Sequence, residues 1–291
     1  MALGTHDAVH LGGSLAQALQ YVSAWTGKTV VVKYGGSILA GADQGTVIED
    51  LVLLKGAGVD PVLVHGGGPE ITRVLERMGR ESRFVNGLRV TDDETMEVVE
   101  MVLAGRANKA LVTMIHRAGG AAAGISGQDG RVFRARRLSD DLGRVGEITT
   151  IDTTLVTVLS RAGYIPVIAS IGVGEDGESY NLNADLAAGA LAAAMSASKL
   201  ILLTDVRGVY RGPDEASLLT VLRAGEARAL IADGVISRGM IPKVQAALEA
   251  IAHGVGSAHI VGGTLPHALL VELFTAEGAG TMIVQDGPAA G

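Results

Sequence analysis

Val30-Val31-Val32-Lys33-Tyr34-Gly35-Gly36 is the stretch that decides the fold. Its three β-branched residues form an apolar run typical of a buried strand, and the run ends in a cation and two adjacent glycines. Glycines at a strand exit let backbone N–H groups approach an anion closely. The stretch therefore predicts a phosphate site at the end of a buried strand, although by itself it also fits a plain turn that follows a solvated lysine.

The composition favours an α/β protein with two lobes. The 291 residues include only 3% aromatics, so Val, Leu, Ile and Ala must fill the core, as they do when helices pack on a mostly parallel sheet. A formal charge of −7 disfavours a general nucleic-acid or membrane-binding surface. The absence of cysteine excludes disulfides and thiolate metal sites. No apolar run reaches about 18 residues and the N-terminus lacks a signal pattern, so we expect a soluble cytoplasmic protein.

A second strand also ends in glycines. The apolar run 61–64 leads into His65-Gly66-Gly67-Gly68-Pro69, and a helical pattern begins at the proline. Free N–H groups and the helix dipole converge at such a junction, which predicts a cradle for a polar or anionic ligand. The alternative is a close strand–helix crossing that needs no side chains. His65 is interpreted as structural, and without clustered histidines we expect no protein metal site.

Two matches to nucleotide-binding motifs are rejected because of their context. Gly27-Lys28-Thr29 resembles the end of a Walker A loop, but the earlier glycine is missing and a strand follows. Gly172–Gly177 fits GxGxxG but opens no helix, and we interpret its Glu175-Asp176-Gly177 end as a turn. Dinucleotide binding, and with it an NAD-dependent oxidoreductase, is therefore weakly supported.

Residues 84–91 are expected to be extended and to carry Arg89. Its planar guanidinium suits a substrate carboxylate, whereas a salt bridge to a neighbouring acid is the simpler alternative. Thr91 and Glu94 fit a capping box for the helix that follows. Glycine turns between 119 and 147 predict hairpins at an edge. The arginines of that segment are interpreted as a solvated face: Arg131, Arg134, Arg136 and Arg137.

The last two polar motifs each precede a helix. In Asn181-Leu182-Asn183-Ala184-Asp185, two amides and a carboxylate could project toward one pocket, although helix capping alone explains Asn183 or Asp185. In Gly239-Met240-Ile241-Pro242-Lys243, the lysine falls in the first turn, where it opposes the helix dipole unless an anion lies nearby. Between these motifs, the apolar run that starts at Leu200 predicts a buried strand and a second βα series.

Taken in order, these stretches resemble the amino-acid kinase family, in its branch that phosphorylates N-acetyl-L-glutamate. Any one of them is weak, but the ordered set is specific and covers nearly the whole chain. The resemblance implies an α/β fold: a three-layer αβα sandwich around a mainly parallel open sheet, in two lobes. It divides the chain into an N-terminal helix (1–26), an N-terminal lobe for the acyl-amino acid (27–197) and a C-terminal nucleotide-binding lobe (198–291).

The same resemblance implies phosphoryl transfer from ATP with Mg²⁺ to the side-chain carboxylate of N-acetyl-L-glutamate, in arginine biosynthesis. A carboxylate nucleophile is already ionised near neutral pH, so the site needs cations and alignment rather than a general base. Lys33 and Lys243 would stabilise the transferring phosphoryl group, and Asp185 would organise them. By matching positions, the substrate residues would be Gly66, Gly67, Arg89 and Asn181, and the nucleotide residues Gly35, Gly36, Thr204, Asp205, Gly208, Tyr210 and Met240.

Residues 14–25 have the apolar spacing of an amphipathic helix. The helix and its Tyr21 resemble the extra N-terminal helix of the arginine-inhibited, hexameric members of the family. We therefore expect a homohexamer with feedback inhibition by arginine. The C-terminal residues that resemble the effector site of that subclass are His267, Glu272, Thr275, Gly278 and Gly280.

The sequence departs from the family pattern at two places: Ser37-Ile38-Leu39 replaces a frequent Asn-Ala-Met, and Arg238 stands where glycine is frequent. Both changes could alter affinity. Two other functions remain open within the fold. One is a kinase for carrier-protein-bound aminoadipate or glutamate, and the other is a non-catalytic arginine-sensing protein.

Overall fold

The computed structural model describes residues 22–36, 45–237, 239–275 and 277–287. Within the expected N-terminal helix, residues 22–25 are helical. The rest of that helix lies outside the described residues, as do Tyr21, the Ser37-Ile38-Leu39 departure and Arg238.

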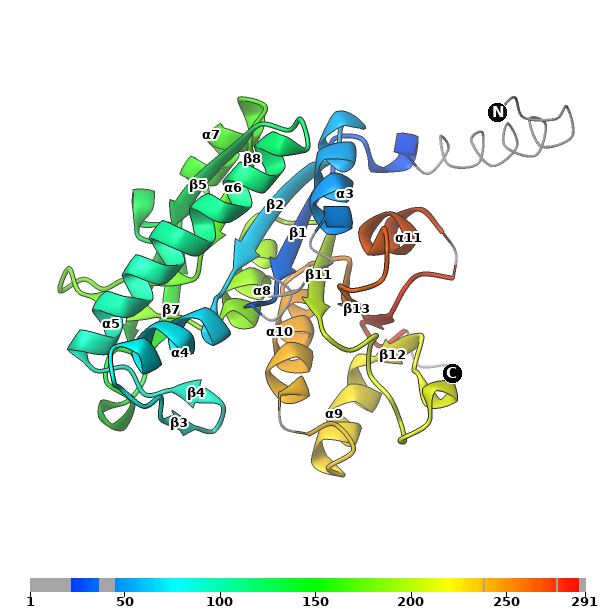
Figure 1. Cartoon of the computed structure of the whole chain (residues 1–291). Coiled ribbons are helices and arrows are strands. Elements are labelled where there is room, and N and C mark those ends of the chain that lie inside the picture. Colours follow the sequence, from blue (N-terminus) through cyan, green and yellow to red (C-terminus); the bar gives the residue numbers. More distant parts are fainter. Residues whose placement is uncertain (1–21, 37–44, 238, 276, 288–291) are drawn as a thin grey trace, which may run out of the picture.

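Eight strands form an open sheet in the middle of the protein (Figure 1). They are β1 (Thr29–Tyr34), β2 (Asp60–His65), β5 (Ala122–Ser126), β8 (Ile165–Ala169), β11 (Lys199–Thr204), β12 (Val221–Arg223), β13 (Ser257–Gly262) and β14 (Thr281–Val284). The order is β12-β14-β13-β11-β1-β2-β8-β5, and neighbours run parallel except for β13 and β14. The mainly parallel open sheet expected from the sequence is therefore confirmed.

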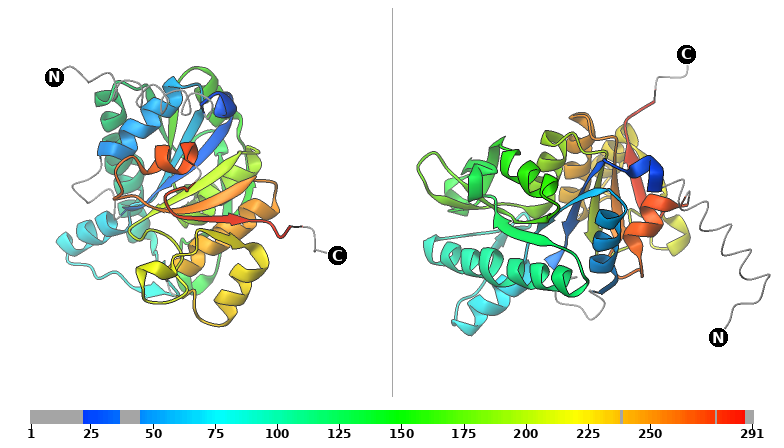
Figure 2. Two further views of the ribbon diagram at one scale, coloured as in Figure 1. Left: turned by 90° about the vertical axis from the view of Figure 1, so that its right-hand side faces the viewer. Right: turned by 90° about the horizontal axis from the view of Figure 1, so that it is seen from above.

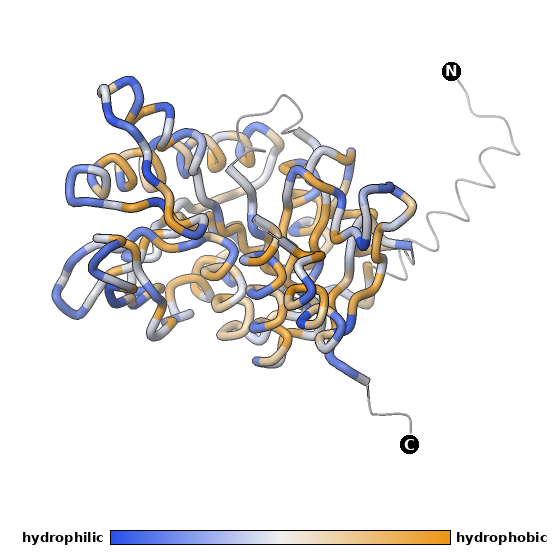
Figure 3. The backbone as a smooth tube through the Cα atoms, turned by 90° about the horizontal axis from the view of Figure 1, so that it is seen from below, coloured by the Kyte–Doolittle hydropathy of each residue, from blue (hydrophilic) through white to orange (hydrophobic). Residues whose placement is uncertain are grey.

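Helices cover both faces of this sheet, which makes the three layers visible from above (Figure 2). Successive residues of β1 alternate between the two cores: Val30 and Val32 pack on one face, and Val31 on the other. The apolar segments gather in the interior and the hydrophilic loops lie at the rim (Figure 3). One face carries α3 (Gly45–Gly56), α6 (Asn108–Arg117) and α11 (Ala268–Phe274), and the other carries α7 (Thr154–Arg161), α8 (Ala184–Ala194), α9 (Ala224–Ala232) and α10 (Met240–Ala252).

A smaller sheet and a hairpin lie beside the main sheet. The small sheet has the order β10-β9-β6-β7, and its strands are β6 (Phe133–Arg137), β7 (Gly146–Ile151), β9 (Ile171–Val173) and β10 (Ser179–Asn181). The hairpin pairs β3 (Phe84–Val85) with β4 (Leu88–Arg89). The GxGxxG match begins in β9 and ends in the turn between β9 and β10, so the interpretation of Glu175-Asp176-Gly177 as a turn is confirmed.

The expectation of edge hairpins between 119 and 147 is only partly right. β6 and β7 do form an antiparallel pair, and the four arginines of the segment are exposed. β5, however, belongs to the main sheet, where it pairs parallel to β8. Its partner lies about forty residues further along the chain, so no local turn signal marks the pairing.

A long helical segment follows the β3–β4 hairpin. It comprises α5 (Asp93–Glu100), the π-helical η1 (Met101–Ala107) and α6, which are joined without a break in helical backbone. A separate helix, α4 (Gly68–Arg77), precedes the hairpin. The predicted capping box at Thr91 is wrong by one residue. Asp92 is the N-cap and accepts a hydrogen bond from the Thr95 N–H, 2.8 Å away. The Thr91 hydroxyl instead donates to the Arg89 carbonyl, at 2.8 Å.

The proposed lobe boundary between 197 and 198 lies in the connection between α8 and β11, so it divides the strands of the main sheet between the two parts. β1 from the first part of the chain lies beside β11 from the second, with Lys33 opposite Leu202. The two parts therefore share one continuous sheet, and their division into two lobes remains a prediction.

Candidate active site

Three charged side chains meet at the end of β1. Lys33 is on β1, while Asp185 and Lys243 lie in the first turns of α8 and α10. The Lys33 Nζ is 2.8 Å from Asp185 Oδ1, and the Lys243 Nζ is 3.0 Å from Asp185 Oδ2. Asp185 is favoured at its position by the helix dipole, and it also supplies the anion that Lys243 needs in the first turn of α10. One buried carboxylate thus holds two ammonium groups in place.

The electrostatics of this cluster depend on burial. Burial lowers the pKa of the Lys33 ammonium, and the nearby Asp185 carboxylate opposes that effect. Burial would raise the pKa of Asp185, but the charges of Lys33 and Lys243 outweigh it and hold that pKa below its ordinary value. Asp185 is therefore ionised at neutral pH. The three residues together carry one net positive charge, which suits an anionic ligand, although the Asp205 carboxylate also acts on Lys33 and offsets part of that charge.

A cavity of about 200 Å³ opens next to the cluster. Its walls come from the two glycine motifs, from β4, and from the junction between β10 and α8. Asn183 lines the cavity. So do seven of the site residues predicted from the sequence: Lys33, Gly36, Gly66, Gly67, Arg89, Asn181 and Asp185. Sequence reasoning missed several further lining residues, among them Phe84, Leu103, Val145 and Ser170.

The two glycine motifs touch each other across the cavity. A Cβ at Gly36 would lie 3.0 Å from the Pro69 Cδ and 3.2 Å from the Gly67 Cα. A Cβ at Gly67 would lie 2.7 Å from the Leu103 Cδ2 on the π-helical segment. A side chain at either glycine would therefore force its neighbours to shift, and the close approach brings backbone of the two loops to the same ligand space.

Arg89 is buried and, among the described residues, forms no ion pair with a carboxylate. Its Nη2 donates to the Gly68 carbonyl and to the Thr72 hydroxyl, each at 2.8 Å. Its Nη1 donates to the Ser82 hydroxyl, and the Phe84 ring lies 4.7 Å from the guanidinium carbon. The salt-bridge alternative is thus absent from the described part of the chain. The guanidinium is held by neutral groups beside the cavity, an arrangement that suits a ligand carboxylate.

Asn181 and Asn183 have different environments. The Asn183 side chain caps α8 by accepting hydrogen bonds from the N–H groups of Asp185 and Leu186, at 2.9 and 3.1 Å. Capping therefore accounts for Asn183, as the sequence alternative allowed. The Asn181 side chain instead donates to the Thr91 hydroxyl at 3.2 Å. No helix end explains Asn181, so its amide is the better candidate for a ligand contact.

His65 supports the second glycine motif from behind. The Asn108 side-chain amide donates to Nε2 at 3.1 Å, so Nδ1 carries the proton that is donated to the Gly66 carbonyl, also at 3.1 Å. Burial lowers the pKa of His65 to about 4, which keeps the ring neutral. Its interpretation as structural agrees with this position. Asn108 was missed, and its only signal is an amide on the apolar face of a helix.

The predicted nucleotide residues lie mostly outside this cavity. Thr204 ends β11, and its hydroxyl donates to the Asp205 carboxylate at 2.9 Å. A Cβ at Gly208 would lie 2.4 Å from the Thr281 Oγ1, so packing is sufficient to explain that glycine. Tyr210 pairs with Leu218 in an isolated bridge, Met240 begins α10, and Gly35 directly follows β1. Their roles in nucleotide binding remain predictions.

The predicted effector residues form two hydrogen-bonded groups near α11. The His267 Nδ1 lies 2.7 Å from the Asp50 Oδ1 of α3. Glu272 is buried, with one oxygen hydrogen-bonded to the His259 ring and the other accepting from the Ala279 N–H at 2.5 Å. A Cβ at Gly278 would lie 3.0 Å from the same carboxylate. Both oxygens of Glu272 are thus engaged within the protein, and an arginine guanidinium would have to compete with these contacts.

Thr275 and Gly280 complete the predicted effector set. The Thr275 hydroxyl donates to the Val271 carbonyl at 2.7 Å, and it accepts from the Gly278 N–H at 3.2 Å. A Cβ at Gly280 would lie 2.1 Å from the Ile260 carbonyl oxygen. Local packing therefore explains both residues, and an effector role remains a prediction.

The described residues offer neither a metal-binding cluster nor a membrane-spanning helix. Within the described residues there is no group of three His, Cys, Asp or Glu side chains placed to hold a metal ion. Asp185 is also occupied by two lysines, so it is not a free metal ligand. In the same described part of the chain, no helix is both long enough and apolar enough to cross a membrane.

A sequence profile of the amino acid kinase family matches residues 28–262. The chain belongs to the amino acid kinase family. Among curated relatives in the family, the acetylglutamate kinase of Heliobacterium modesticaldum is 51% identical over 96% of this chain and 99% of its own length. The acetylglutamate kinase of Nitrosococcus oceani is 48% identical over 97% of this chain and 99% of its own.

Solved structures of the kinase fold agree with this membership. N-acetylglutamate synthase from Neisseria gonorrhoeae, complexed with coenzyme A and N-acetyl-glutamate, has a TM-score of 0.84 and 27% identity. The match covers 94% of this chain but 63% of that longer one. Carbamate kinase from Giardia lamblia bound to AMP-PNP has a TM-score of 0.63 at 18% identity, which supports the fold alone.

Proposed function

We propose that this chain is an acetylglutamate kinase, which transfers the γ-phosphoryl group of ATP to the side-chain carboxylate of N-acetyl-L-glutamate in arginine biosynthesis. The products are N-acetyl-L-glutamyl 5-phosphate and ADP. The observation that carries the proposal is the Lys33–Asp185–Lys243 cluster, because its Lys33 and Asp185 line a cavity that Arg89 and Asn181 also line. Curated relatives of that name, about half identical over nearly the full length, support it.

The residues suit phosphoryl transfer to a carboxylate. The nucleophile is already ionised near neutral pH, so the reaction needs positive charge and alignment. Lys33 and Lys243 stabilise the charge that spreads over the transferred group and the leaving oxygen. Asp185 fixes the two ammonium groups and does not act as a base, because its low pKa leaves it a poor proton acceptor.

Substrate and nucleotide take different parts of the site. Arg89 pairs with a carboxylate of the acyl-amino acid, Asn181 binds its amide group, and the backbone at Gly66 and Gly67 completes the cradle. ATP is held by Thr204, Asp205, Gly208, Tyr210 and Met240, and by Gly35 and Gly36 at its phosphates. Mg²⁺ arrives with the nucleotide and neutralises phosphate charge, which fits a site whose buried carboxylate already pairs with lysines.

The test is formation of hydroxamate from N-acetyl-L-glutamate, ATP and hydroxylamine, which traps the acyl phosphate. We expect the wild-type chain to give hydroxamate, and folded Lys33→Ala and Lys243→Ala variants to lose nearly all of it. Lys55→Ala is the matched control. The Lys55 Nζ lies 2.7 Å from the Asp60 Oδ1, and this ion pair does not line the cavity. Activity that requires a carrier-protein-bound substrate would instead favour the aminoadipate or glutamate kinase.

Four finer parts of the proposal concern regulation, assembly, domain division and location. We propose feedback inhibition by arginine, a homohexamer formed through the N-terminal helix, and two lobes within a cytoplasmic enzyme. The contact of Trp25 with Lys28 and Lys199, at 4.9 and 5.1 Å from the ring centre, supports a packed end for that helix. Adding arginine to the hydroxamate assay and measuring the mass in solution test the first two. Arginine binding by a chain that makes no hydroxamate would favour the non-catalytic sensor.

A further inference from the structure

A short backbone segment, residues 143–145, joins two walls of the cavity. It forms parallel bridges from Gly143 to Thr91 and from Val145 to Asn181. The Arg144 N–H donates to the Thr91 carbonyl at 2.6 Å, and the Arg144 carbonyl accepts from the Asn181 N–H at 2.8 Å. We call residues 143–145 the strap, because they connect the end of the β3–β4 hairpin with the end of β10.

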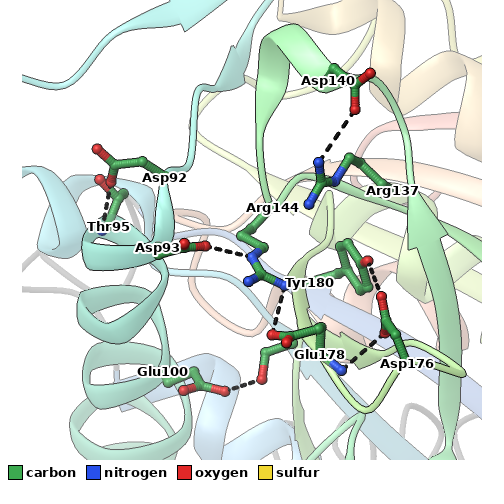
Figure 4. Close-up of polar contacts among 11 residues, drawn as sticks. Asp92, Asp93, Thr95, Glu100, Arg137, Asp140, Arg144, Asp176, Glu178 and Tyr180 are labelled. Carbon is green, nitrogen blue, oxygen red and sulfur yellow. Dashed lines mark hydrogen bonds and ion pairs between the residues drawn. The ribbon is translucent and has the colours of Figure 1, made fainter.

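The Arg144 side chain makes a second connection between the same walls (Figure 4). Its Nε lies 2.6 Å from the Asp93 carboxylate at the start of α5, and its Nη1 lies 2.6 Å from Glu178 in the β9–β10 hairpin. Only 18% of the Arg144 side chain is exposed. One guanidinium therefore ties the helix that follows Arg89 to the hairpin that contains Asn181.

A hydrogen-bond relay through Thr91, which the strap contacts, reaches both predicted substrate residues. The Asn181 amide donates to the Thr91 hydroxyl at 3.2 Å, and that hydroxyl donates to the Arg89 carbonyl at 2.8 Å. Thr91 is fully buried, so its hydroxyl has no bulk water as an alternative partner. The positions of Arg89 and Asn181 are thus coupled through Thr91.

The strap has little freedom to move. Gly143 has a φ of +67°, and a Cβ there would lie 2.3 Å from the Thr91 carbonyl oxygen. Only glycine allows the strap to approach Thr91 this closely. The close contact, the two bridges and the guanidinium act on the same pair of walls.

We propose that Arg144 is a positioning residue for the acyl-amino acid, which keeps Arg89 and Asn181 at a fixed separation through the strap. The inference rests on the proposed function, because it takes the cavity to be the substrate site. Loss of Arg144 lets the β9–β10 hairpin and α5 shift relative to each other, which misplaces the contacts to the substrate. Lys33, Asp185 and Lys243 are not part of the strap, so the nucleotide side of the site keeps its geometry.

The experiment compares Arg144→Ala with Arg136→Ala. Arg136 is a matched control, because it also pairs with a carboxylate, Glu147 at 2.8 Å, in the small sheet but does not touch the strap. We expect Arg144→Ala to raise the KM and the calorimetric Kd for N-acetyl-L-glutamate about tenfold, with the KM for ATP within twofold of wild type. Arg136→Ala should leave all these values within twofold. An unchanged KM for N-acetyl-L-glutamate in folded Arg144→Ala overturns the proposal, and so does an equal rise for both substrates.

Two further variants separate positioning from a folding defect. Arg144→Lys keeps the charge and can retain one of the two ion pairs, so it should restore part of the affinity for N-acetyl-L-glutamate. The Asp93→Asn/Glu178→Gln double variant changes two largely exposed carboxylates, whose pairs contribute little to stability, and it should reproduce the KM of Arg144→Ala. A double variant with wild-type KM refutes the role of the guanidinium. A wild-type chain that neither binds nor phosphorylates N-acetyl-L-glutamate refutes the proposed function itself.

Discussion

Replacing Asp185 with asparagine removes the negative charge between two buried ammonium groups while keeping the size of the side chain. The Asp185 carboxylate lies 2.8 Å from one nitrogen and 3.0 Å from the other. Burial already lowers the pKa of Lys33, and Asp185 is the main opposing influence. The substitution should therefore lower that pKa further, so that Lys33 loses its proton at a lower pH than in the wild type.

The size of the effect follows from the geometry. At an effective dielectric constant of about 20, each pair contributes about 6 kcal/mol of gross attraction, most of which is offset by the cost of desolvation. Breaking a buried pair of this kind typically lowers the free energy of unfolding by about 3–5 kcal/mol. An opposite charge at this distance changes a pKa by about one to three units, so the alkaline limb of the rate profile should move down by that amount. We also expect kcat at neutral pH to fall about 100-fold.

The assay is hydroxamate formation between pH 6 and 10, with urea unfolding of the same preparations. Asp60→Asn is the control, because Asp60 pairs with Lys55 at 2.7 Å but is partly exposed and distant from the cavity. It should leave the pH profile unchanged. If folded Asp185→Asn gives a profile that superimposes on that of the wild type, Asp185 does not maintain the charge of Lys33 and the reasoning is refuted.

Three other predictions concern the glycine loops, the buried histidine and the substrate arginine. A Cβ at Gly36 would lie 3.0 Å from the Pro69 Cδ, so Gly36→Ala should lower kcat/KM at least tenfold. Gly105→Ala is the control, because a Cβ at Gly105 would meet open space, and it should leave kcat/KM unchanged. Equal kcat/KM values for the two variants would contradict this prediction. Because burial lowers the pKa of His65 from 6.5 to about 4, the unfolded chain binds an extra proton between these values, and the free energy of unfolding should fall by about 2 kcal/mol from pH 7 to pH 5. Urea unfolding at both pH values should show a smaller loss for His65→Gln, and an equal loss would exclude this residue as the cause. Arg89→Lys loses the planar fork and should raise the KM for N-acetyl-L-glutamate about tenfold with the KM for ATP unchanged; steady-state kinetics check both.

Much of the main sheet could be predicted because its strands are continuous apolar runs. β1, β2, β8 and β11 are buried on both faces, so each appears in the sequence as consecutive Val, Ile and Leu residues. β5 is the counterexample. Its sequence, Ala-Ala-Gly-Ile-Ser, has little apolar character, and its place is set by pairing with β8. Long-range pairing of this kind leaves no local signal.

The charged centre of the site was also accessible from the sequence. Lys33, Asp185 and Lys243 belong to the ordered motifs that resemble the family, and the structure brings their side chains together. The supporting contacts were not accessible. Arg144 and Asn108 act through backbone groups and side chains that lie about 35 to 60 residues away in the chain, and neither belongs to a recognisable motif.

The π-helical segment between α5 and α6 determines the direction in which two side chains point from the helix. Leu103 within it packs against Gly67, and Asn108 just after it reaches His65. An α-helix advances about 100° for each residue, so deleting a single residue from Met101–Ala107 would turn one contact away by roughly that angle if the other stayed in place. The number of residues in this segment, more than their identity, determines whether the glycine cradle is supported from both sides.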